Sequence, residues 1–427
     1  MNARIFTWSI VSALAGFLFG FDTVVISGAE QTLQSLWRLS PAAHGVVMGT
    51  ALYGTVVGAM AGAWPADRYG RRATLLFVGL LYCVSALWSA LANDPWSFGI
   101  ARFLGGLGIG FSTVVAPLYI TEIAPPAWRG RLTALFQFNI VFGILVAFLS
   151  NALLAGVGEQ AWRWMLGVAA APALVYTLLC LRIPESPRWI AQREAGRAGP
   201  ALGGSAAGRA VPGSGLWSPR LRRPLMLAFL VAFFNQLSGI NAILYFAPRI
   251  FEMTGLGSQA ALLQSVGIGV TNLLFTGLGL WLIDRLGRRT LLLIGSVGYI
   301  VSLGLTAWAF HSGHHAIVPA CIFAFIAAHA IGQGTVIWVF ISEIFPQQHR
   351  AAGQALGSST HWVFAALLTS AFPVMVAALA PATVFLFFCG MMVLQLLWVV
   401  FLVPETRGVP LEELERRLAP TVPPIPR

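Results

Sequence analysis

Apolar stretches of roughly 20 residues alternate with short polar breaks along almost the whole chain. About 20 consecutive apolar residues are what a helix needs to cross the hydrocarbon core of a bilayer. The pattern therefore predicts an all-α membrane protein with twelve transmembrane helices. Their approximate limits are 5–29, 43–65, 74–92, 98–122, 131–155, 162–183, 224–250, 259–283, 290–310, 316–343, 351–379 and 383–403.

The composition supports the same class of protein. Of the 427 residues, 57% are hydrophobic and 10% are charged, and the mean hydropathy is +0.78. A soluble protein carries roughly 25% charged residues, so this chain has too few charges to cover a water-facing surface. The first apolar run lacks the cleavage site of a secretory signal and continues to Asp22 and Glu30, which indicates an uncleaved first span.

The positions of the 26 arginines predict the orientation in the membrane. If both termini are cytoplasmic, only Arg38, Arg163 and Arg249 fall on the outer side, and Arg102 lies within a span. Such an excess of arginine on one side is the positive-inside pattern of membrane proteins. It explains the net charge of +11 without a nucleic-acid partner. We therefore expect a multi-pass protein of the cell (inner) membrane with both termini in the cytoplasm.

The longest polar interruption lies in the middle of the chain. Gly196–Gly215 has a Gly/Ala/Ser/Arg/Pro composition that cannot bury apolar surface and is typical of a mobile linker. After it, Leu411–Leu418 is expected to form a short amphipathic helix on the membrane surface. The predicted organisation is an N-terminal six-helix bundle at 1–184, a cytoplasmic linker at 185–223, a C-terminal six-helix bundle at 224–403 and a cytoplasmic tail at 404–427.

The two halves repeat the same charged motifs at nearly equal separations. DRYGRR at 67–72 recurs as DRLGRR at 284–289, and PES at 184–186 recurs as PET at 404–406. Each half also has a glutamate seven residues before an arginine. One interpretation is charge that merely orients the loops; the other is bidentate bridges that form an inner gate between the halves. The gating residues predicted in this way are Asp67, Arg68, Arg71, Arg72, Glu122, Arg129, Glu185, Asp284, Arg285, Arg288, Arg289, Glu343, Arg350 and Glu405.

These motifs resemble the sugar porter family of the major facilitator superfamily. The resemblance rests on DRYGRR together with RFLGGLGIG (102–110), APLYITEIAPPAWRGRL (116–132), PESPRW (184–189), NQLSGINAILYFAP (235–248), WVFISEIFP (338–346) and PETRG (404–408). It covers essentially the whole chain except the linker, where the family usually has a larger helical segment. It implies the major facilitator fold and transport by alternating access.

Amides within the predicted spans are the candidates for a sugar site. A lone intramembrane Asn or Gln often only joins helices, but sugar recognition needs several neutral hydrogen-bonding groups and an aromatic face. By resemblance to the family, amide positions contact the sugar hydroxyls and tryptophans cover the sugar. Asn235 and His361 stand where the family often has Gln or another amide, and GQGTVIW (332–338) lacks the usual prolines. The predicted substrate-binding residues are Gln137, Asn235, Gln236, Asn241, Asn272, Trp338, His361 and Trp362.

Asp22 and Arg102 are the ionisable residues placed well inside the predicted spans. An unpaired arginine at that depth is costly, so the simplest interpretation is a neutralising pair between two helices. The alternative is that protonation of Asp22 breaks the pair and couples a proton to transport. FGFDTVVISG (19–28) resembles the first helix of the family's proton symporters, and Arg102 matches the family's partner residue, which favours proton coupling.

Together these observations predict proton-coupled symport of a monosaccharide, with an uncoupled facilitator or a porter of a polyol or other small neutral solute as alternatives. A membrane-embedded enzyme is disfavoured because HExxH, GxSxG and an intramembrane His/Asp cluster are missing from the sequence. No cofactor or metal is expected. The expected partners are a sugar, protons and the lipid bilayer, with no nucleic acid and with the monomer as the functional unit.

Overall fold

The computed structural model describes residues 3–125, 128–197, 217–346, 349–409 and 411–418. Within these ranges it contains 12 helical segments that are long and apolar enough to cross a membrane. They agree with the predicted spans to within a few residues at most ends, so the all-α, twelve-span prediction is confirmed. Most of the predicted linker segment Gly196–Gly215 lies outside the described residues.

In the part of the first half that the structure describes, the chain forms a series of helical elements. They are α1 (Ala3–Val25), η1 (Ile26–Gly28), α2 (Glu30–Leu36), α3 (Pro41–Ala61), α4 (Ala63–Tyr69), α5 (Arg71–Leu91), α6 (Pro95–Ile123), α7 (Arg129–Leu154), α8 (Ala161–Gly167), α9 (Ala170–Cys180) and α10 (Pro187–Arg197). Local sequence explains two of the starts. Ser40 and Asp94 accept hydrogen bonds from main-chain N–H groups of α3 and α6, and a proline follows each of them at the first helical position.

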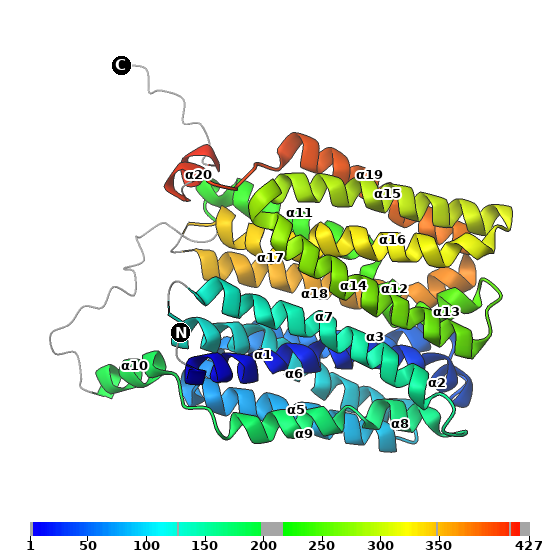
Figure 1. Cartoon of the computed structure of the whole chain (residues 1–427), viewed down its shortest axis with the longest axis horizontal. Coiled ribbons are helices and arrows are strands. Elements are labelled where there is room, and N and C mark those ends of the chain that lie inside the picture. The colour runs from blue at the N-terminus through cyan, green and yellow to red at the C-terminus, as the bar shows by residue number, and fades with distance from the viewer. Residues whose placement is uncertain (1–2, 126–127, 198–216, 347–348, 410, 419–427) are drawn as a thin grey trace.

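The second half begins after the central segment. Its elements are η3 (Pro219–Leu221), α11 (Arg222–Leu237), α12 (Ile240–Tyr245), α13 (Ala247–Glu252), α14 (Ser258–Leu286), α15 (Arg288–Ser312), η4 (His315–Ile317), α16 (Val318–Ile331), α17 (Gln333–Ile344), α18 (Arg350–Ala378), α19 (Pro381–Leu402) and α20 (Leu411–Leu418). The helices of the two halves lie on opposite sides of the molecule (Figure 1), and the pairs α3–α18 and α7–α14 pack across their boundary. We call the end with α10 and α20 the linker end and the end with α2 and α13 the distal end.

Several predicted continuous spans are broken in the structure, among them the seventh and the tenth. The seventh span is interrupted at Ser238 and Gly239, where Gly239 has φ of 88°. This left-handed conformation favours glycine because a Cβ is disfavoured there. The tenth span is interrupted at Gly332 (φ −86°, ψ −100°), although the prolines expected at this point are missing. The first of these breaks brings Asn241 within hydrogen-bond distance of Gln236.

The structure adds detail to two of the polar segments. Pro187–Arg197, within the predicted linker, forms the helix α10, and Trp189 anchors it by donating to the carbonyl of Asp67 at 2.8 Å. The tail helix α20 is present, but Leu414 and Leu418 are buried in the hydrophobic core beside α17. These two residues of its apolar face are therefore covered by protein and not by lipid.

Candidate functional site

An ion pair joins α1 and α6 in the interior of the first half. Arg102 donates from Nη1 to Oδ1 of Asp22 at 2.7 Å and from Nη2 to the main-chain carbonyl of Asp22 at 2.8 Å. Both residues are 3% exposed. Removing one charge from such a pair strands the other in a low-dielectric interior. The structure thus brings together the two residues that the sequence assigned to proton coupling.

A cluster of amides lies at the break between α11 and α12. Gln236 donates from Nε2 to Oδ1 of Asn235 at 2.9 Å, and Asn241 donates from Nδ2 to Oε1 of Gln236 at 2.7 Å. Nε2 of Gln236 also lies 3.1 Å from Nε2 of His361 on α18. The turn at Gly239 folds Asn241 back toward Gln236, five positions earlier. His361, which departs from the family pattern, therefore takes part in the amide cluster.

Aromatic rings adjoin this cluster. The ring centroid of His361 lies 5.1 Å from that of Trp338 on α17 and 4.7 Å from that of Trp362. Trp362 in turn lies 5.5 Å from Phe19 on α1. Its indole Nε1 is buried and has no hydrogen-bond partner among the described residues. An aromatic surface beside neutral amides suits a solute with hydroxyl groups and apolar C–H faces.

The other two predicted amides are not joined to this cluster by hydrogen bonds. Asn272 on α14 accepts from the hydroxyl of Thr276 on its own helix at 3.4 Å. Gln137 is half-buried on α7, in the opposite half. The sequence analysis missed Gln333, a fully buried amide at the start of α17 whose two polar atoms lack partners in the described chain. Its signal in the sequence was the glutamine of GQGTVIW, a segment that lacks the family's usual prolines.

The charged motif at the linker end of the first half forms a compact network. Arg71 makes a bidentate bridge to Glu122 at 2.9 and 3.0 Å and contacts Asp67 at 3.0 Å. Glu185 accepts from the main-chain N–H groups of Arg71 and Arg72. Gly70 has φ of 104°, and a Cβ there would lie 2.2 Å from the Glu185 carboxylate. The glycine of DRYGRR is therefore needed for this turn.

The second half repeats the same network. Arg288 bridges Glu343 at 2.8 and 3.1 Å and contacts Asp284 at 3.2 Å. Glu405 accepts from the main-chain N–H groups of Arg288 and Arg289. The repeated sequence motif thus has a repeated three-dimensional structure. Each network lies within its own half.

The spacing of the motifs along the chain did not identify the partners of Glu122 and Glu343. Glu122 and Glu343 were each associated with an arginine seven residues later, but Arg71 and Arg288 hold them in the structure. Arg129 is exposed at the start of α7 and has no ion pair with the described residues. Nε of Arg350 likewise lacks a hydrogen-bond partner in the described chain. The first turn of α5 points Arg71 at α6, which the linear spacing does not reveal.

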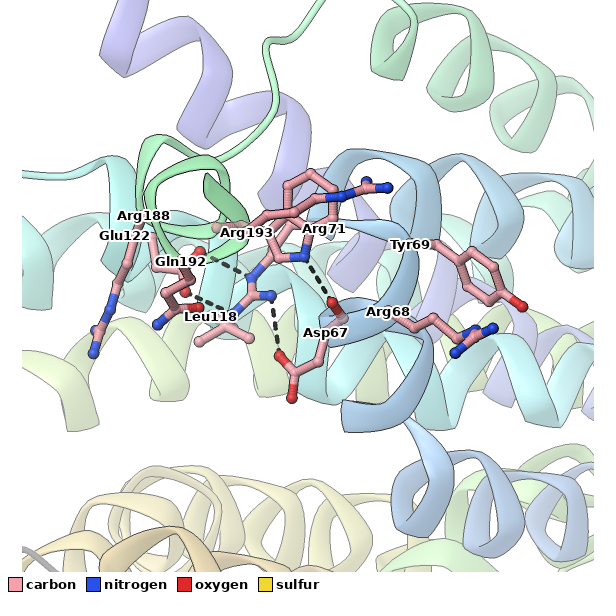
Figure 2. Close-up of a pocket in the computed structure, with 10 residues that line it drawn as sticks. Asp67, Arg68, Tyr69, Arg71, Leu118, Glu122, Arg188, Gln192 and Arg193 are labelled. Carbon is pink, nitrogen blue, oxygen red and sulfur yellow. Dashed lines mark hydrogen bonds and ion pairs between the residues drawn. The ribbon is translucent and has the colours of Figure 1, made fainter. Parts of the chain in front are cut away.

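A cleft of about 760 Å³ opens beside the first-half network. In Figure 2, the guanidinium of Arg71 lies between Asp67 and Glu122, and α10 contributes Arg188 and Arg193 to the lining. The lining residues are Asp67, Arg68, Tyr69, Arg71, Leu118, Glu122, Arg188, Trp189, Gln192 and Arg193. This charged lining distinguishes the cleft from the neutral amide and aromatic cluster.

The distal end has a further ion-paired cluster that crosses the boundary between the halves. Arg249 of α13 makes a bidentate contact with Glu30 of α2 at 2.7 and 2.9 Å and donates to Gln34. Glu30 and His44 are fully buried, and Nε2 of His44 lies 2.8 Å from Glu30. We call Glu30, Gln34, His44 and Arg249 the distal latch. In the sequence, its one signal was that Arg249 is among the few arginines predicted to lie on the outer side.

Other contacts between the halves also lie toward the distal end. Tyr53 hydrogen-bonds to Ser370 at 2.8 Å, and Gln259 donates to the carbonyl of Ala152 at 3.3 Å. At Gly45 a Cβ would lie 1.9 Å from the carbonyl of Ser370, so α3 and α18 are in direct backbone contact. The distal latch therefore lies at the end where the halves are closed together.

Comparison with known proteins gives consistent results. The family described as "Sugar (and other) transporter" matches residues 8–201 and 204–418. The arabinose-proton symporter of Bacillus subtilis is 36% identical over 96% of this chain and 94% of its own length. The D-xylose-proton symporter of Escherichia coli is 32% identical over 97% of this chain and 96% of its own length.

A solved structure is similar throughout. The inward open conformation of the xylose transporter of Escherichia coli superposes with a TM-score of 0.84 at 31% identity. The match covers 97% of this chain and 99% of that structure. Fold, sequence and family profile therefore agree over nearly the full length. The chain belongs to the family of sugar (and other) transporters and has its major facilitator fold.

Proposed function

We propose that this protein carries out proton-coupled symport of a monosaccharide across the cytoplasmic membrane by alternating access. One observation carries the proposal: Phe19 contacts Trp362 of the amide and aromatic cluster and lies one helical turn before Asp22 on α1. A change in the Asp22–Arg102 pair is thereby transmitted along α1 to the proposed sugar site. The names of the relatives, arabinose-proton and D-xylose-proton symporters, support the same activity.

The proposed sugar site is the neutral cluster in the second half, with Gln137 and Asn272 as further wall positions. Its polar groups are amides and an imidazole, which can donate to and accept from the hydroxyls of a monosaccharide. An anionic substrate would require a buried counter-charge, and Arg102 is already paired with Asp22. A neutral sugar is therefore favoured over an organic acid.

We place the linker end in the cytoplasm, with both termini, because most arginines lie at that end. The state described here is then inward-facing: the distal latch closes the outer side and each cytoplasmic network remains within its own half. The halves are proposed to be the N-terminal bundle at 1–184 and the C-terminal bundle at 224–403, working within one monomer. Return to the outward-facing state requires the latch to open and the cytoplasmic surfaces to meet.

Uptake by the purified protein in proteoliposomes tests the function. A panel of labelled pentoses and hexoses should identify one that accumulates against its gradient when the outside is acidic. Dissipating the pH gradient with a protonophore should reduce this uptake to equilibration. A sugar that equilibrates without accumulation under the same gradient would favour the uncoupled facilitator, and uptake of a polyol alone would favour the other alternative.

The inner gate leads to a testable prediction. Arg129→Ala and Arg350→Ala should each shift the population toward the inward-facing state and slow transport, while leaving membrane insertion intact. In the inward-facing state these arginines are not held by either glutamate network, so their loss destabilises only the state in which the cytoplasmic surfaces meet. Cysteines introduced at the distal end should become less reactive toward an external reagent. Arg182→Ala, an exposed linker-end arginine, is the control, and unchanged reactivity in both variants would contradict the prediction.

Breaking the distal latch should shift the population in the opposite direction, toward the outward-facing state. Glu30→Gln and Arg249→Gln each leave one partner of a buried pair without its charge, which typically costs about 3–5 kcal/mol. Because the pair joins the two halves, this cost falls on the inward-facing state and favours the outward-facing one. Spin labels on α2 and α13 should report a longer distance in both variants. Arg38→Gln, an exposed arginine near the same end, should leave the distance unchanged, and equal distances in all variants would refute the latch.

A further inference from the structure

The buried carboxylate of Asp22 has one oxygen that the ion pair does not use. Arg102 contacts Oδ1 and the main-chain carbonyl, whereas Oδ2 has no hydrogen-bond partner among the described residues. Gly105, on the same helix as Arg102, leaves space here: a Cβ would lie 3.4 Å from Oδ2 and 2.5 Å from Oγ of Ser85. Oδ2 and the Ser85 hydroxyl of α5 therefore border the same space beside Gly105.

These hydroxyls form a row along one face of α5. Tyr82, Ser85 and Ser89 are spaced by three and four residues, which places them on the same side of the helix. All three are buried, and within the described chain their hydroxyl oxygens lack hydrogen-bond partners. Tyr82 lies within electrostatic reach of Asp22, and its hydroxyl lies beside that of Ser112 on α6. The row thus begins at the carboxylate that is proposed to carry the proton.

The row continues from Tyr82 toward the linker end. Tyr176 of α9 lies near both Tyr82 and Cys180, and its hydroxyl is also buried without a partner in the described residues. One turn further, the carbonyl of Cys180 accepts from Nε of Arg72 at 3.4 Å. Arg72 belongs to the DRYGRR network at the linker end. The path from Asp22 to that network stays inside the first half and is separate from the amide cluster in the second half.

The second half contains an internal control for this row. Its matched helix α15 has Tyr299, Ser302 and Thr306 at the corresponding positions after DRLGRR. Tyr299 hydrogen-bonds to Nδ1 of His329 at 2.6 Å, while Ser302 and Thr306 donate to carbonyls of their own helix at 2.7 and 2.8 Å. The same sequence pattern is therefore satisfied by protein in one half. It is left unpartnered in the half that contains Asp22.

Buried polar groups that find no protein partner are normally satisfied by ordered water. Phe in place of Tyr and Ala in place of Ser would fill nearly the same space without the cost of an unpaired hydroxyl. A row of such hydroxyls beside a carboxylate therefore indicates a function for them. We propose that Tyr82, Ser85 and Tyr176, with water molecules between them, conduct the proton from Asp22 to the linker end, separately from the sugar. This inference rests on the proposed symport function.

The step is a proton transfer without redox chemistry. The protonated carboxyl group gives its proton from Oδ2 to the adjacent hydroxyl or water, and each member passes on its own proton as it receives one. The bond broken at Asp22 leaves a carboxylate, which re-forms the ion pair with Arg102. The proton leaves at the linker end beside Arg72 and Glu185.

Tyr82→Phe and Tyr176→Phe test the route in proteoliposomes, with two measurements on each variant. Counterflow of labelled sugar needs no net proton movement, and we expect it to be unchanged. Gradient-driven accumulation and sugar-induced proton uptake, read with an entrapped pH dye, should fall by at least about tenfold. Tyr299→Phe in the second half is the matched control and should retain both activities.

The outcomes separate the route from the function. Wild-type symport together with normal proton uptake in Tyr82→Phe and Tyr176→Phe overturns the route alone. A parallel loss of counterflow and accumulation in these variants shows a packing role and also overturns it. A wild-type protein that transports sugar without proton uptake overturns the proposed symport and the route together.

Discussion

Asp22→Asn is expected to abolish the accumulation of sugar against its gradient while sugar binding and exchange are retained. Asparagine has nearly the same shape as aspartate and keeps a side-chain oxygen that can accept a hydrogen bond from Arg102. Its amide does not take up or release a proton at the pH values of a transport experiment. The proton gradient then has no group through which to bias the two states of the transporter. When both are measured on the same proteoliposomes, this variant should lose gradient-driven uptake and keep counterflow.

The control for this prediction is a carboxylate that lies outside the ion pair. Glu159→Gln, at an exposed position between α7 and α8, should accumulate sugar as the wild type does. Since Asn leaves the charge of Arg102 uncompensated, binding of the sugar by titration must be measured too, so that a folded variant is demonstrated. Accumulation by Asp22→Asn at the wild-type level would show that Asp22 is only a structural counter-ion.

Gln236→Ala and Asn241→Ala should each weaken sugar binding by about 1–3 kcal/mol, which corresponds to roughly 5- to 150-fold in Kd. Each substitution removes an amide that is proposed to bind the sugar. It also breaks the 2.7 Å hydrogen bond between Asn241 and Gln236, so the remaining amide loses a partner. The double variant should therefore lose less than the sum of the two single losses. Trp338→Ala should cost at least as much as either, because it removes the aromatic face beside His361.

Asn139→Ala is the control for the three substitutions in the proposed sugar site. This amide lies on α7 and donates to the carbonyl of Leu135 on its own helix at 2.8 Å, so its removal should leave the affinity unchanged. Isothermal titration with the accumulated sugar measures all of these variants. If the three pocket variants bind the sugar with wild-type affinity, the proposed site is wrong.

One helix, α1, connects the Asp22–Arg102 pair with the proposed sugar site. Asp22 and Phe19 are neighbours on α1, and Phe19 contacts Trp362 in the opposite half. α1 also packs very closely on α7, because at Gly20 a Cβ would lie 1.9 Å from the carbonyl of Ile140. The helix α1 therefore contacts both α7 of its own half and the aromatic wall of the proposed sugar site.

Several features of the site were predictable from local sequence. Repetition of DRYGRR as DRLGRR predicted matched charge networks, and the structure has them at Arg71 and Arg288. The intramembrane Asp22 and Arg102 predicted an ion pair because a single charge at that depth is costly. In each case a strong local constraint, either charge in an apolar span or a repeated motif, reduced the number of possible arrangements.

The choice among partners required the tertiary structure. Glu122 pairs with Arg71 and not with the nearer Arg129, because the first turn of α5 directs its arginine at α6. Glu30 pairs with Arg249, 219 positions away, where the helices of the two halves meet at the distal end. Tyr82 and Tyr299 occupy matched sequence positions, yet only Tyr299 has a histidine opposite it. Hydropathy and motif spacing act along one chain segment, so they determine the spans, the repeat and the membrane class. Contacts between segments depend on helix rotation and crossing, and these are determined by packing across the whole molecule.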